Sequence, residues 1–362
     1  MRVLLSGGGT AGHIYPALTV AGRLVADGHE VLFVGTPDGL ESRLVPEAGI
    51  EFVGVPAKGF DRGNPLTIIS STALIATSIG SAARAIRTFG PDVVLGVGGY
   101  VSLPVGLAAV LKRVPLVLHE QNSVPGLANR VLSRWARAVG VTYEESLQHL
   151  AHPERGVVTG NPVREAVLGA DRLRGRAAFD LDAEATVLLV FGGSRGARHI
   201  NDTFVGLAPQ LMGEPSLQVL HSAGRIEAAS VASRVADALG RDQRRYRVVD
   251  YIDAMGDAIA AADVVISRAG ATSIAEITAI GRAAVLVPYP YATDDHQTLN
   301  ARAVAEAGGA ELVPDDELGS ERFREVVLGI VQDAGRRSAM AAASAALGRR
   351  DATERVVALL DG

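Results

Sequence analysis

The same short pattern occurs twice in this chain of 362 residues, once near its start and once just after its middle. Residues 3–13 read VLLSGGGTAGH, and residues 187–197 read VLLVFGGSRGA. Each is an apolar, strand-like run that passes into a glycine-rich turn and opens a helical pattern. A strand, a glycine turn and a helix in this order begin a Rossmann-like unit. The repeat therefore predicts two such units, and the length of the chain also favours two domains.

Short apolar, β-branched runs alternate with helical patterns along the whole chain, which predicts parallel sheets built from βαβ units. The strands predicted in the first half are 2–6, 31–35, 51–55, 92–96, 115–119, 138–142 and 157–158. Those predicted in the second half are 186–191, 217–221, 246–250, 263–267, 283–288 and 310–313. We therefore expect an α/β fold with two Rossmann-like parallel-sheet domains facing across a cleft.

The domain boundary is expected near residues 160–164, because Asn161-Pro162 favours an extended or turn conformation and stops the preceding element. We place an N-terminal domain at 1–161 and a C-terminal domain at 162–344. The last stretch, 345–362, contains a helical pattern that no strand follows. It could pack on either domain.

Composition is that of a globular protein, with 48% hydrophobic and 21% charged residues. The formal net charge of −5 gives no overall basic field, so nucleic acid is not a predicted partner. The chain has no cysteine, which excludes disulfides, thiolate metal sites and cysteine nucleophiles. The apolar run at the N-terminus is too short for a secretion signal. We expect a cytoplasmic protein.

Two stretches without charge, 65–83 and 93–111, need comparison with a membrane span. The first is rich in Ser, Thr and Gly, and the second is interrupted by Gly98, Gly99 and Pro104. Neither supplies the roughly 20 strongly apolar residues of a spanning helix. Both are predicted to be buried core.

The opening loop has the Gly7-x-Gly9-x-x-Gly12 spacing of a dinucleotide site, which alone is a weak indication. An NAD site also requires an acidic residue at the end of the second strand, and Asp38 comes late, in a turn. NAD is therefore disfavoured. The alternative is a turn whose backbone N–H groups face another anion, with the Thr10 hydroxyl as a further donor.

His13 follows this turn on the first turn of the predicted helix. A helix N-terminus favours the neutral imidazole, which can accept a proton. His13 is thus either a general base or a residue that only hydrogen-bonds the loop.

Polar residues follow two further strands of the first half. Gly98, Gly99 and Tyr100 follow one of them, and Gly residues there allow a ligand to approach closely. His119, Glu120, Gln121 and Asn122 follow the next, and one of these four could simply cap a helix. The carboxyl edge of an open α/β sheet is where ligands bind.

The second half has its own strand-end loops. Gly192, Gly193, Ser194 and Gly196 could cradle a diphosphate, with charge from Arg195 and Arg198 unless these two face solvent. In the loop 267–277, Glu276 lies one turn after Thr272 and Ser273, where a carboxylate could accept both hydroxyls of a ribose.

His296, Gln297 and Asn300 share one helical face and suit recognition of sugar hydroxyls. Asp294-Asp295, just before them, are assigned to the N-terminal charge of a helix rather than to a metal site. Since no D-x-D motif follows a strand, we predict no required metal and no cofactor.

Seven motifs in this order and spacing resemble one family: GGTAGH, GVGGYVSLP, HEQNSVPG, GNPVR, FGGSRGA, SRAGATSIAE and HQTLNA. The chain is similar over nearly its whole length to the MurG family of N-acetylglucosaminyltransferases, in glycosyltransferase family 28. The resemblance implies the GT-B fold and a role in peptidoglycan synthesis, and hence in cell wall biogenesis, cell shape and cell division. It implies inverting transfer of N-acetylglucosamine (GlcNAc) from UDP-GlcNAc to undecaprenyl-pyrophosphoryl-N-acetylmuramyl-pentapeptide (lipid I), giving lipid II.

The resemblance also implies a set of site residues. The C-terminal domain would bind the donor and the N-terminal domain the acceptor, at the cytoplasmic face of the membrane. The substrate-binding residues expected from motifs and resemblance together are Thr10, Ala11, Gly12, Tyr100, Asn122, Arg164, Ser194, Ile252, Ala271, Thr272, Ser273, Ile274, Ala275, Glu276, His296, Gln297 and Asn300.

The chain departs from the family pattern at two places. It has His296-Gln297 where some members have Gln-Gln, so either residue could make the key sugar contact. It also has Ala11 where a glycine is common, which narrows the freedom of the backbone. For the base, His13 is the first candidate and Glu120 the second. Helix N-termini, glycine-loop amides and Arg164 would stabilise the charge of the leaving UDP.

A lipid acceptor raises the question of a membrane-binding surface. An isoleucine stripe at helical spacing, with basic residues nearby, is either such a surface or an ordinary core face. Its members are Ile68, Ile75, Ile79 and Ile86, and the basic residues are Arg84, Arg87, Lys112 and Arg113.

Three rival functions remain at this point. A UDP-GlcNAc 2-epimerase or another nucleotide-sugar transferase would share the fold. The hypothesis of an NAD(P)-dependent oxidoreductase is weakened because no acidic residue stands at the end of the second predicted strand. A non-catalytic nucleotide-sugar sensor would bind the donor without turnover.

Overall fold

The computed structural model describes residues 1–57, 67–193 and 198–361, with the side chains of 67–75 and 241–242 left out. The chain forms two compact units. The first consists of Met1–Arg164 together with Arg350–Gly362, and the second is Glu165–Arg349. The sequence placed the boundaries after residues 161 and 344.

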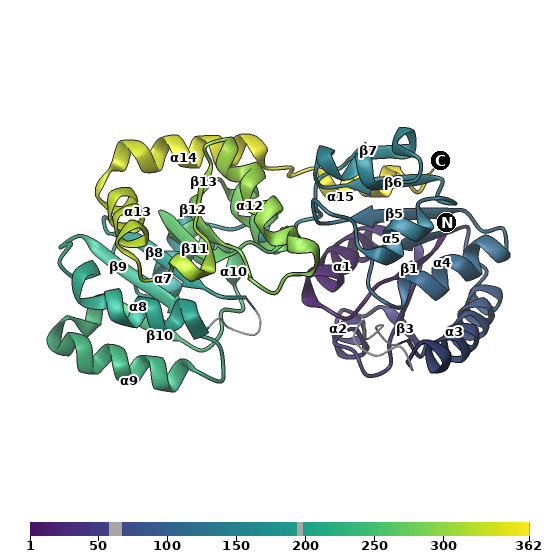
Figure 1. The fold of residues 1–362 in the computed structure, drawn as a ribbon, viewed down its shortest axis with the longest axis horizontal. Coiled ribbons are helices and arrows are strands. Elements are labelled where there is room, and N and C mark those ends of the chain that lie inside the picture. Colours follow the sequence, from purple (N-terminus) through teal and green to yellow (C-terminus); the bar gives the residue numbers. More distant parts are fainter. Residues whose placement is uncertain (58–66, 194–197, 362) are drawn as a thin grey trace. The chain divides into compact units, whose positions relative to one another are not determined.

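The first unit is built on a seven-stranded parallel sheet in the order β3-β2-β1-β4-β5-β6-β7 (Figure 1). Its strands are β1 (Arg2–Ser6), β2 (Glu30–Gly35), β3 (Glu51–Gly54), β4 (Val93–Gly96), β5 (Leu116–Glu120), β6 (Ala138–Val141) and β7 (Gly156–Val158). Its helices are α1 (Ala11–Ala26), α2 (Glu41–Glu47), α3 (Thr67–Phe89), α4 (Ser102–Leu111), α5 (Leu127–Leu132) and α15 (Ala352–Ala358), with 3₁₀ turns at Glu144–His149 and Pro153–Arg155.

The second unit is built on a six-stranded parallel sheet in the order β10-β9-β8-β11-β12-β13. Its strands are β8 (Thr186–Phe191), β9 (Leu217–Ser222), β10 (Tyr246–Val249), β11 (Val264–Arg268), β12 (Ala283–Val287) and β13 (Ala310–Leu312). Its helices are α6 (Glu165–Leu168), α7 (Arg172–Ala178), α8 (Arg198–Leu211), α9 (Ala228–Leu239), α10 (Met255–Ala261), α11 (Ala271–Ile280), α12 (His296–Glu306), α13 (Glu321–Gln332) and α14 (Ala334–Leu347), with 3₁₀ turns at Gly240–Arg245, Thr293–Asp295 and Asp315–Glu317.

The strands are apolar because both faces of each sheet are covered by helices (Figure 1). In β1, Leu4 packs into one core cluster, while Val3 and Leu5 pack into the cluster on the opposite face. In β8, Leu188 and Leu189 are divided between two clusters in the same way. The prediction of an α/β fold with two Rossmann-like parallel-sheet domains is confirmed.

The predicted burial of the second uncharged stretch is confirmed: it forms β4 and α4, and most of its residues are buried. Part of the first stretch lies outside the described residues. In the isoleucine stripe, Ile86 is buried and Ile79 packs against the same core cluster. The side chains of Ile68 and Ile75 lie outside the part of the chain that the structure describes. None of the helices in the described residues is both long enough and apolar enough to span a bilayer.

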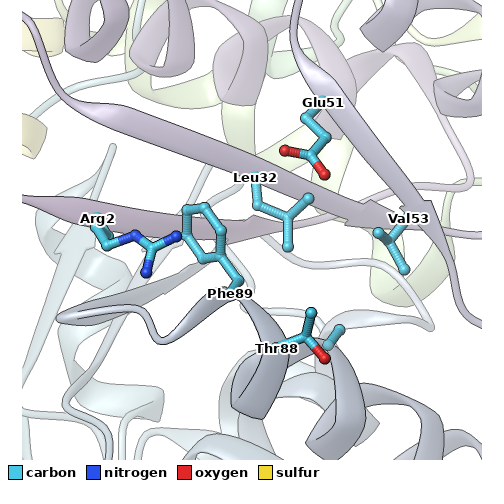
Figure 2. A pocket seen from close by; sticks show the side chains of 7 residues that line it. Arg2, Leu32, Glu51, Val53, Thr88 and Phe89 are labelled. Atoms are coloured by element: carbon cyan, nitrogen blue, oxygen red, sulfur yellow. The ribbon is translucent and has the colours of Figure 1, made fainter.

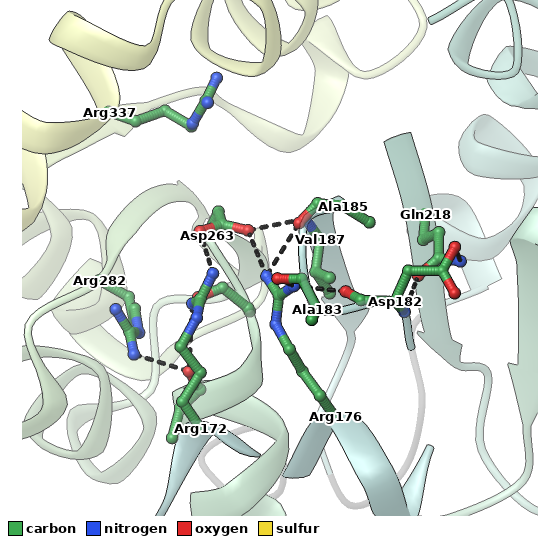
Figure 3. Close-up of polar contacts among 12 residues, drawn as sticks. Arg172, Arg176, Asp182, Ala183, Ala185, Val187, Gln218, Asp263, Arg282 and Arg337 are labelled. Atoms are coloured by element: carbon green, nitrogen blue, oxygen red, sulfur yellow. Dashed lines mark hydrogen bonds and ion pairs between the residues drawn. The ribbon is translucent and has the colours of Figure 1, made fainter. Parts of the chain in front are cut away.

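Helix α7, which follows the boundary between the two units, is bound to the second sheet by arginines clustered around Asp263 (Figure 3). Asp263 accepts hydrogen bonds from Arg172 at 2.7 Å, from Arg176 at 3.1 Å and from the Val187 backbone at 2.8 Å. Arg176 is 3% exposed, and it also donates to the carbonyls of residues 182, 183 and 185. Because Asp263 and Val187 lie where β11 and β8 begin, this cluster holds the amino-terminal edge of the sheet.

Candidate active site

Each sheet reverses its strand order once, between β1 and β4 in the first unit and between β8 and β11 in the second. Ligands of open α/β sheets bind at the carboxyl ends of the strands that flank such a reversal. The motifs at 7–13 and 97–100 follow β1 and β4, and the motif at 269–276 follows β11. The loop after β8 holds Ser194, Arg195 and Gly196, which lie outside the described residues.

In the first unit, the two glycine turns at the reversal pack directly on each other. A Cβ atom on Gly99 would lie 2.3 Å from the carbonyl oxygen of Gly8, so no side chain fits there. Gly9, Gly98 and Gly99 have φ values of 85°, 93° and 83°, a region that favours glycine. Gly99 is thus required by the contact between the turns and by its backbone conformation, and Gly9 and Gly98 are favoured by their backbone conformation.

A buried carboxylate, that of Glu41, accepts a hydrogen bond from the backbone of the first of these turns. Glu41, the first residue of α2, is 0% exposed and accepts hydrogen bonds from Thr36 N at 2.9 Å and from Gly9 N at 3.4 Å. A Cβ on Gly8 would lie 2.1 Å from its Oε1 atom. Glu41 is not the acid of an NAD site, because it lies beyond the end of β2 and its carboxylate binds the backbone of the glycine turn. The sequence reasoning missed Glu41, although it begins the first helix after that strand.

His13 is the third residue of α1, in its first turn, and is half-buried. Its Nδ1 atom lies 2.7 Å from Oε1 of Gln121, which follows β5. The ring is thus hydrogen-bonded to a side chain of the loop after β5 rather than to its own loop. Thr10 and Gly12 beside it are exposed, and Ala11 is half-buried. The first turn of α1 contains no acidic residue, which leaves the positive end of the helix dipole uncompensated by its own side chains.

Glu120, the second candidate base, is 1% exposed and surrounded by donors. One oxygen accepts from the backbone and side chain of Asn122 at 3.0 and 3.3 Å, and the other accepts from Gly126 N at 3.1 Å and Asn129 Nδ2 at 2.8 Å. Both oxygens are occupied in holding the loop between β5 and α5. The geometry favours His13 over Glu120 for proton transfer.

The remaining candidates of the first unit are spread around these turns. Tyr100 is 59% exposed, and Asn122 is half-buried beside Glu120. The guanidinium of Arg164 lies over the ring of Tyr15, 5.0 Å from its centroid. Roles for these residues in binding stay predictions.

In the second unit, α11 begins at the reversal with Gly270 as its N-cap and without a side-chain cap. Glu276 is 5% exposed, Ala271 and Ile274 are buried, and Thr272, Ser273 and Ala275 are half-buried. The resemblance implies that Ile252 contacts the uracil through its backbone; its side chain is 2% exposed in the core, and its role in binding stays a prediction. An uncapped helix N-terminus with a carboxylate one turn later suits a nucleoside diphosphate.

The structure separates the three polar residues of α12. Gln297 accepts from Tyr289 N through its Oε1 at 2.9 Å, which leaves its NH₂ group to face a ligand. His296 donates from Nδ1 to the Thr293 carbonyl at 2.7 Å. Asn300 is fully buried and donates to the Ala269 carbonyl at 3.4 Å, so it supports the loop before α11. The expected face of three sugar-reading groups is thus reduced to His296 and Gln297.

The two aspartates before α12 form a turn. Asp294 and Asp295 have φ values of 51° and 50°, and Asp295 is the N-cap of α12. Within the described residues, no three His, Asp or Glu side chains are grouped closely enough to hold a metal ion.

A pocket in the first unit lies at the opposite edge of the sheet (Figure 2). Arg2 and Glu51, which begin β1 and β3, line it together with Phe89 at the end of α3. Because ligand sites of this fold lie at the carboxyl edge, this pocket is not part of the candidate site.

Sequence comparisons agree with this arrangement. The glycosyltransferase family 28 N-terminal domain matches residues 3–141, and the family 28 C-terminal domain matches residues 187–356. The chain is 39% identical to the UDP-N-acetylglucosamine–N-acetylmuramyl-(pentapeptide) pyrophosphoryl-undecaprenol N-acetylglucosamine transferase of Desulfitobacterium hafniense, over 99% of this chain and 98% of that protein. It is 41% identical to the protein of the same name from Moorella thermoacetica, over 99% and 98%.

Solved structures of other proteins have the same fold as this chain. MurG of Acinetobacter baumannii superimposes with a TM-score of 0.80 at 31% identity, over 99% of both chains. A UDP-GlcNAc 2-epimerase of Neisseria meningitidis shares the fold with a TM-score of 0.71 at 16% identity, over 99% of both chains. Two Rossmann-like units of this kind define the GT-B class of glycosyltransferase folds. The chain belongs to glycosyltransferase family 28, and within it to the MurG family of N-acetylglucosaminyltransferases.

Proposed function

We propose that this chain transfers GlcNAc from UDP-GlcNAc to the muramyl 4-hydroxyl of lipid I and releases UDP, which gives lipid II for peptidoglycan synthesis. The names of its full-length relatives give this donor and this lipid-linked acceptor. The observation that carries most weight is the pairing of features at the two strand reversals. One has a glycine turn followed by His13, and the other has an uncapped helix followed by Glu276.

The proposed reaction is a direct displacement. The acceptor O4 attacks C1 of GlcNAc while the bond from C1 to the β-phosphate oxygen breaks, and UDP leaves with the electron pair. The proton of the acceptor hydroxyl passes to Nε2 of His13. A single displacement inverts the anomeric centre, since the attack comes from the side opposite the leaving group.

The donor is assigned to the second unit. Glu276 would accept the ribose hydroxyls, and the N-terminus of α11 would face the diphosphate. The amide of Gln297 would donate to a sugar hydroxyl, because its oxygen is already bound to Tyr289 N. Helix dipoles and Arg164 would stabilise the charge that develops on the leaving group, and no metal ion is required in this scheme.

A transfer assay with labelled UDP-GlcNAc and a lipid I analogue tests the proposal. The expected product is a lipid-linked disaccharide, formed with one UDP per transfer and at an unchanged rate in EDTA. A 2-epimerase would convert UDP-GlcNAc in the absence of the acceptor. That result, without a lipid product, would overturn the proposal.

We further propose that the first unit docks on the cytoplasmic leaflet through an apolar and basic surface on α4 and α5. α4 packs on α5, and the segment from α5 to residue 135 exposes Leu127, Val131 and Trp135. Arg130 and Arg134 are exposed on the same segment, and Lys112 and Arg113 are exposed just after the end of α4. Apolar side chains set among cations fit an anionic bilayer surface. This surface is separate from the isoleucine stripe, in which Ile79 and Ile86 pack on the core and Ile68 and Ile75 have no described side chains.

Sedimentation with liposomes tests this second proposal. Trp135→Glu should reduce binding to vesicles that contain anionic lipid, because it removes apolar area and adds a repelled charge. Leu173→Glu is the matched control, since Leu173 is an exposed apolar residue of the second unit. Equal binding by the two variants would contradict the assignment of the surface.

A further inference from the structure

Three polar side chains form a continuous hydrogen-bonded chain behind His13. Nδ1 of His13 lies 2.7 Å from Oε1 of Gln121, and Nε2 of Gln121 lies 3.0 Å from Nδ1 of His119. Nε2 of His119 lies 2.9 Å from the carbonyl oxygen of Gly160, in the segment after β7. Gln121 and His119 are each 1% exposed. The hydrogen-bonded series thus runs from the first turn of α1 through the interior of the first unit.

The positions of the protons along this hydrogen-bonded series can be assigned by starting from the Gly160 carbonyl. The Gly160 carbonyl can only accept, so Nε2 of His119 carries a hydrogen. Burial lowers the pKa of His119 to about 4, and the ring is neutral, so its Nδ1 is an acceptor. The atom of Gln121 that faces it must therefore be the NH₂ group.

The same amide group also lies 3.0 Å from the Val97 carbonyl, which again requires a donor. The oxygen of Gln121 consequently faces His13. An amide oxygen can only accept, so Nδ1 of His13 carries a hydrogen. In the neutral ring, the lone pair is then on Nε2.

We propose that Gln121 and His119 are positioning residues that hold neutral His13 in the Nδ1–H tautomer and make Nε2 its proton-accepting atom. This inference rests on the proposed function for its catalytic meaning. A ring whose Nδ1 had no such partner would populate both tautomers, and one of them has no lone pair on Nε2. The ring also lies close to Gly98, where an added Cβ would be only 3.2 Å from Cε1 of His13, so a side chain at position 98 would crowd the ring.

The tautomer can be read directly by ¹⁵N NMR of histidine-labelled protein, with the His13 signal assigned by its loss in His13→Asn. We expect the protonated nitrogen of the neutral ring to be Nδ1. His221 is an internal control of opposite pattern. Its Nε2 faces Oδ1 of Asn201 at 3.0 Å and its Nδ1 faces the Tyr246 hydroxyl at 3.0 Å. A His13 ring that is protonated at Nε2 in the wild-type protein would overturn the inference.

Gln121→Met tests the role of the amide, since methionine has similar volume but no strong hydrogen-bonding group. The Nδ1–H signature of His13 should be lost, while the Nε2–H signature of His221 should stay. We expect kcat to fall roughly 10²-fold with an unchanged KM for UDP-GlcNAc, as for other small errors of positioning. If the His13 tautomer and kcat are both retained in this variant, Gln121 is not a positioning residue.

Gln121→Glu separates a tautomer effect from a packing effect. A carboxylate can only accept, so it should keep the Nδ1–H tautomer of the neutral His13 ring, although it places a charge in a buried site. A purely structural role for Gln121 predicts the reverse, with greater disturbance by Glu than by Met. Because these NMR signals need no turnover, they can match expectation in a protein that shows no transfer. Failure of the proposed function is therefore distinguishable from failure of this inference.

Discussion

At the residue scale, His13 is the group on which the proposed chemistry depends. His13→Ala should lower kcat by about 10²–10⁴, the usual loss when a general base is removed. The affinity for UDP-GlcNAc should change little, because His13 is assigned to the acceptor hydroxyl and not to the donor. Steady-state transfer kinetics and equilibrium UDP-GlcNAc binding measure the two effects.

His152→Ala is a suitable control for that experiment. His152 is also in the first unit, but it is paired only with Glu154 at the surface and is assigned no role. The kcat of His152→Ala should match that of the wild-type protein. An unchanged kcat in His13→Ala would remove His13 from the role of base.

Sequence reasoning found His13 and Glu120 and preferred His13 for its place at a predicted helix N-terminus, but it could not show the surroundings of either residue. The ranking by structure depends on contacts between distant residues. His13 meets Gln121 across 108 positions, and Glu120 is enclosed by Asn122, Gly126 and Asn129. Neither environment leaves a periodic signal in the sequence. The same reason explains why the burial of Asn300 was not predicted.

At the scale of elements, every predicted strand is present, with ends that differ by no more than one residue. These strands were predictable because burial on both faces requires unbroken apolar runs. Two placements were not predictable. α15 packs on α1, and the salt bridge from Arg23 to Glu354 at 2.8 Å joins residues 331 positions apart. Glu41 enters its site from a helix rather than from the end of a strand.

The arginine cluster at the amino-terminal edge of the second sheet gives a prediction about stability (Figure 3). Asp263→Ala should lower the free energy of unfolding by about 3 kcal/mol, because buried Arg176 would lose its carboxylate partner. Burial already lowers the pKa of Arg176, which reflects the cost of its charge in this site. Urea denaturation measures the loss.

Asp202→Ala is the matched control for Asp263→Ala. Asp202 pairs with Arg234 at 2.5 Å, and both side chains are 45% exposed. Loss of such a surface pair should cost less than about 1 kcal/mol. If the two variants are destabilised equally, the cluster does not hold the edge of the sheet.

At the scale of the whole molecule, each unit contains one buried neutral histidine whose protonation opposes folding. Burial lowers the pKa of His119 and of His221 from 6.5 to about 4. The unfolded chain therefore binds protons first as the pH falls. The stability from these groups is fully present above pH 6.5 and is lost as the pH falls toward 4. Urea denaturation at pH 7 and pH 5 should show a loss of about 2 kcal/mol per histidine.

His221→Gln tests the source of this pH dependence. A glutamine amide can still donate to Asn201 and accept from Tyr246, but it does not titrate. The loss of stability between pH 7 and pH 5 should become smaller in this variant. An unchanged loss would show that other groups cause it.

The central claim is a division of work between the units, in which the second binds the donor and the first binds and activates the acceptor. Glu276→Ala tests this most directly, because Glu276 lies in the second unit and is assigned to the donor ribose. The measurement is the affinity for UDP-GlcNAc beside the KM for a lipid I analogue. We expect donor affinity to fall at least about tenfold, a loss of roughly 1.4 kcal/mol, with little change in the KM of the acceptor. Equal weakening of donor and acceptor binding would contradict the account.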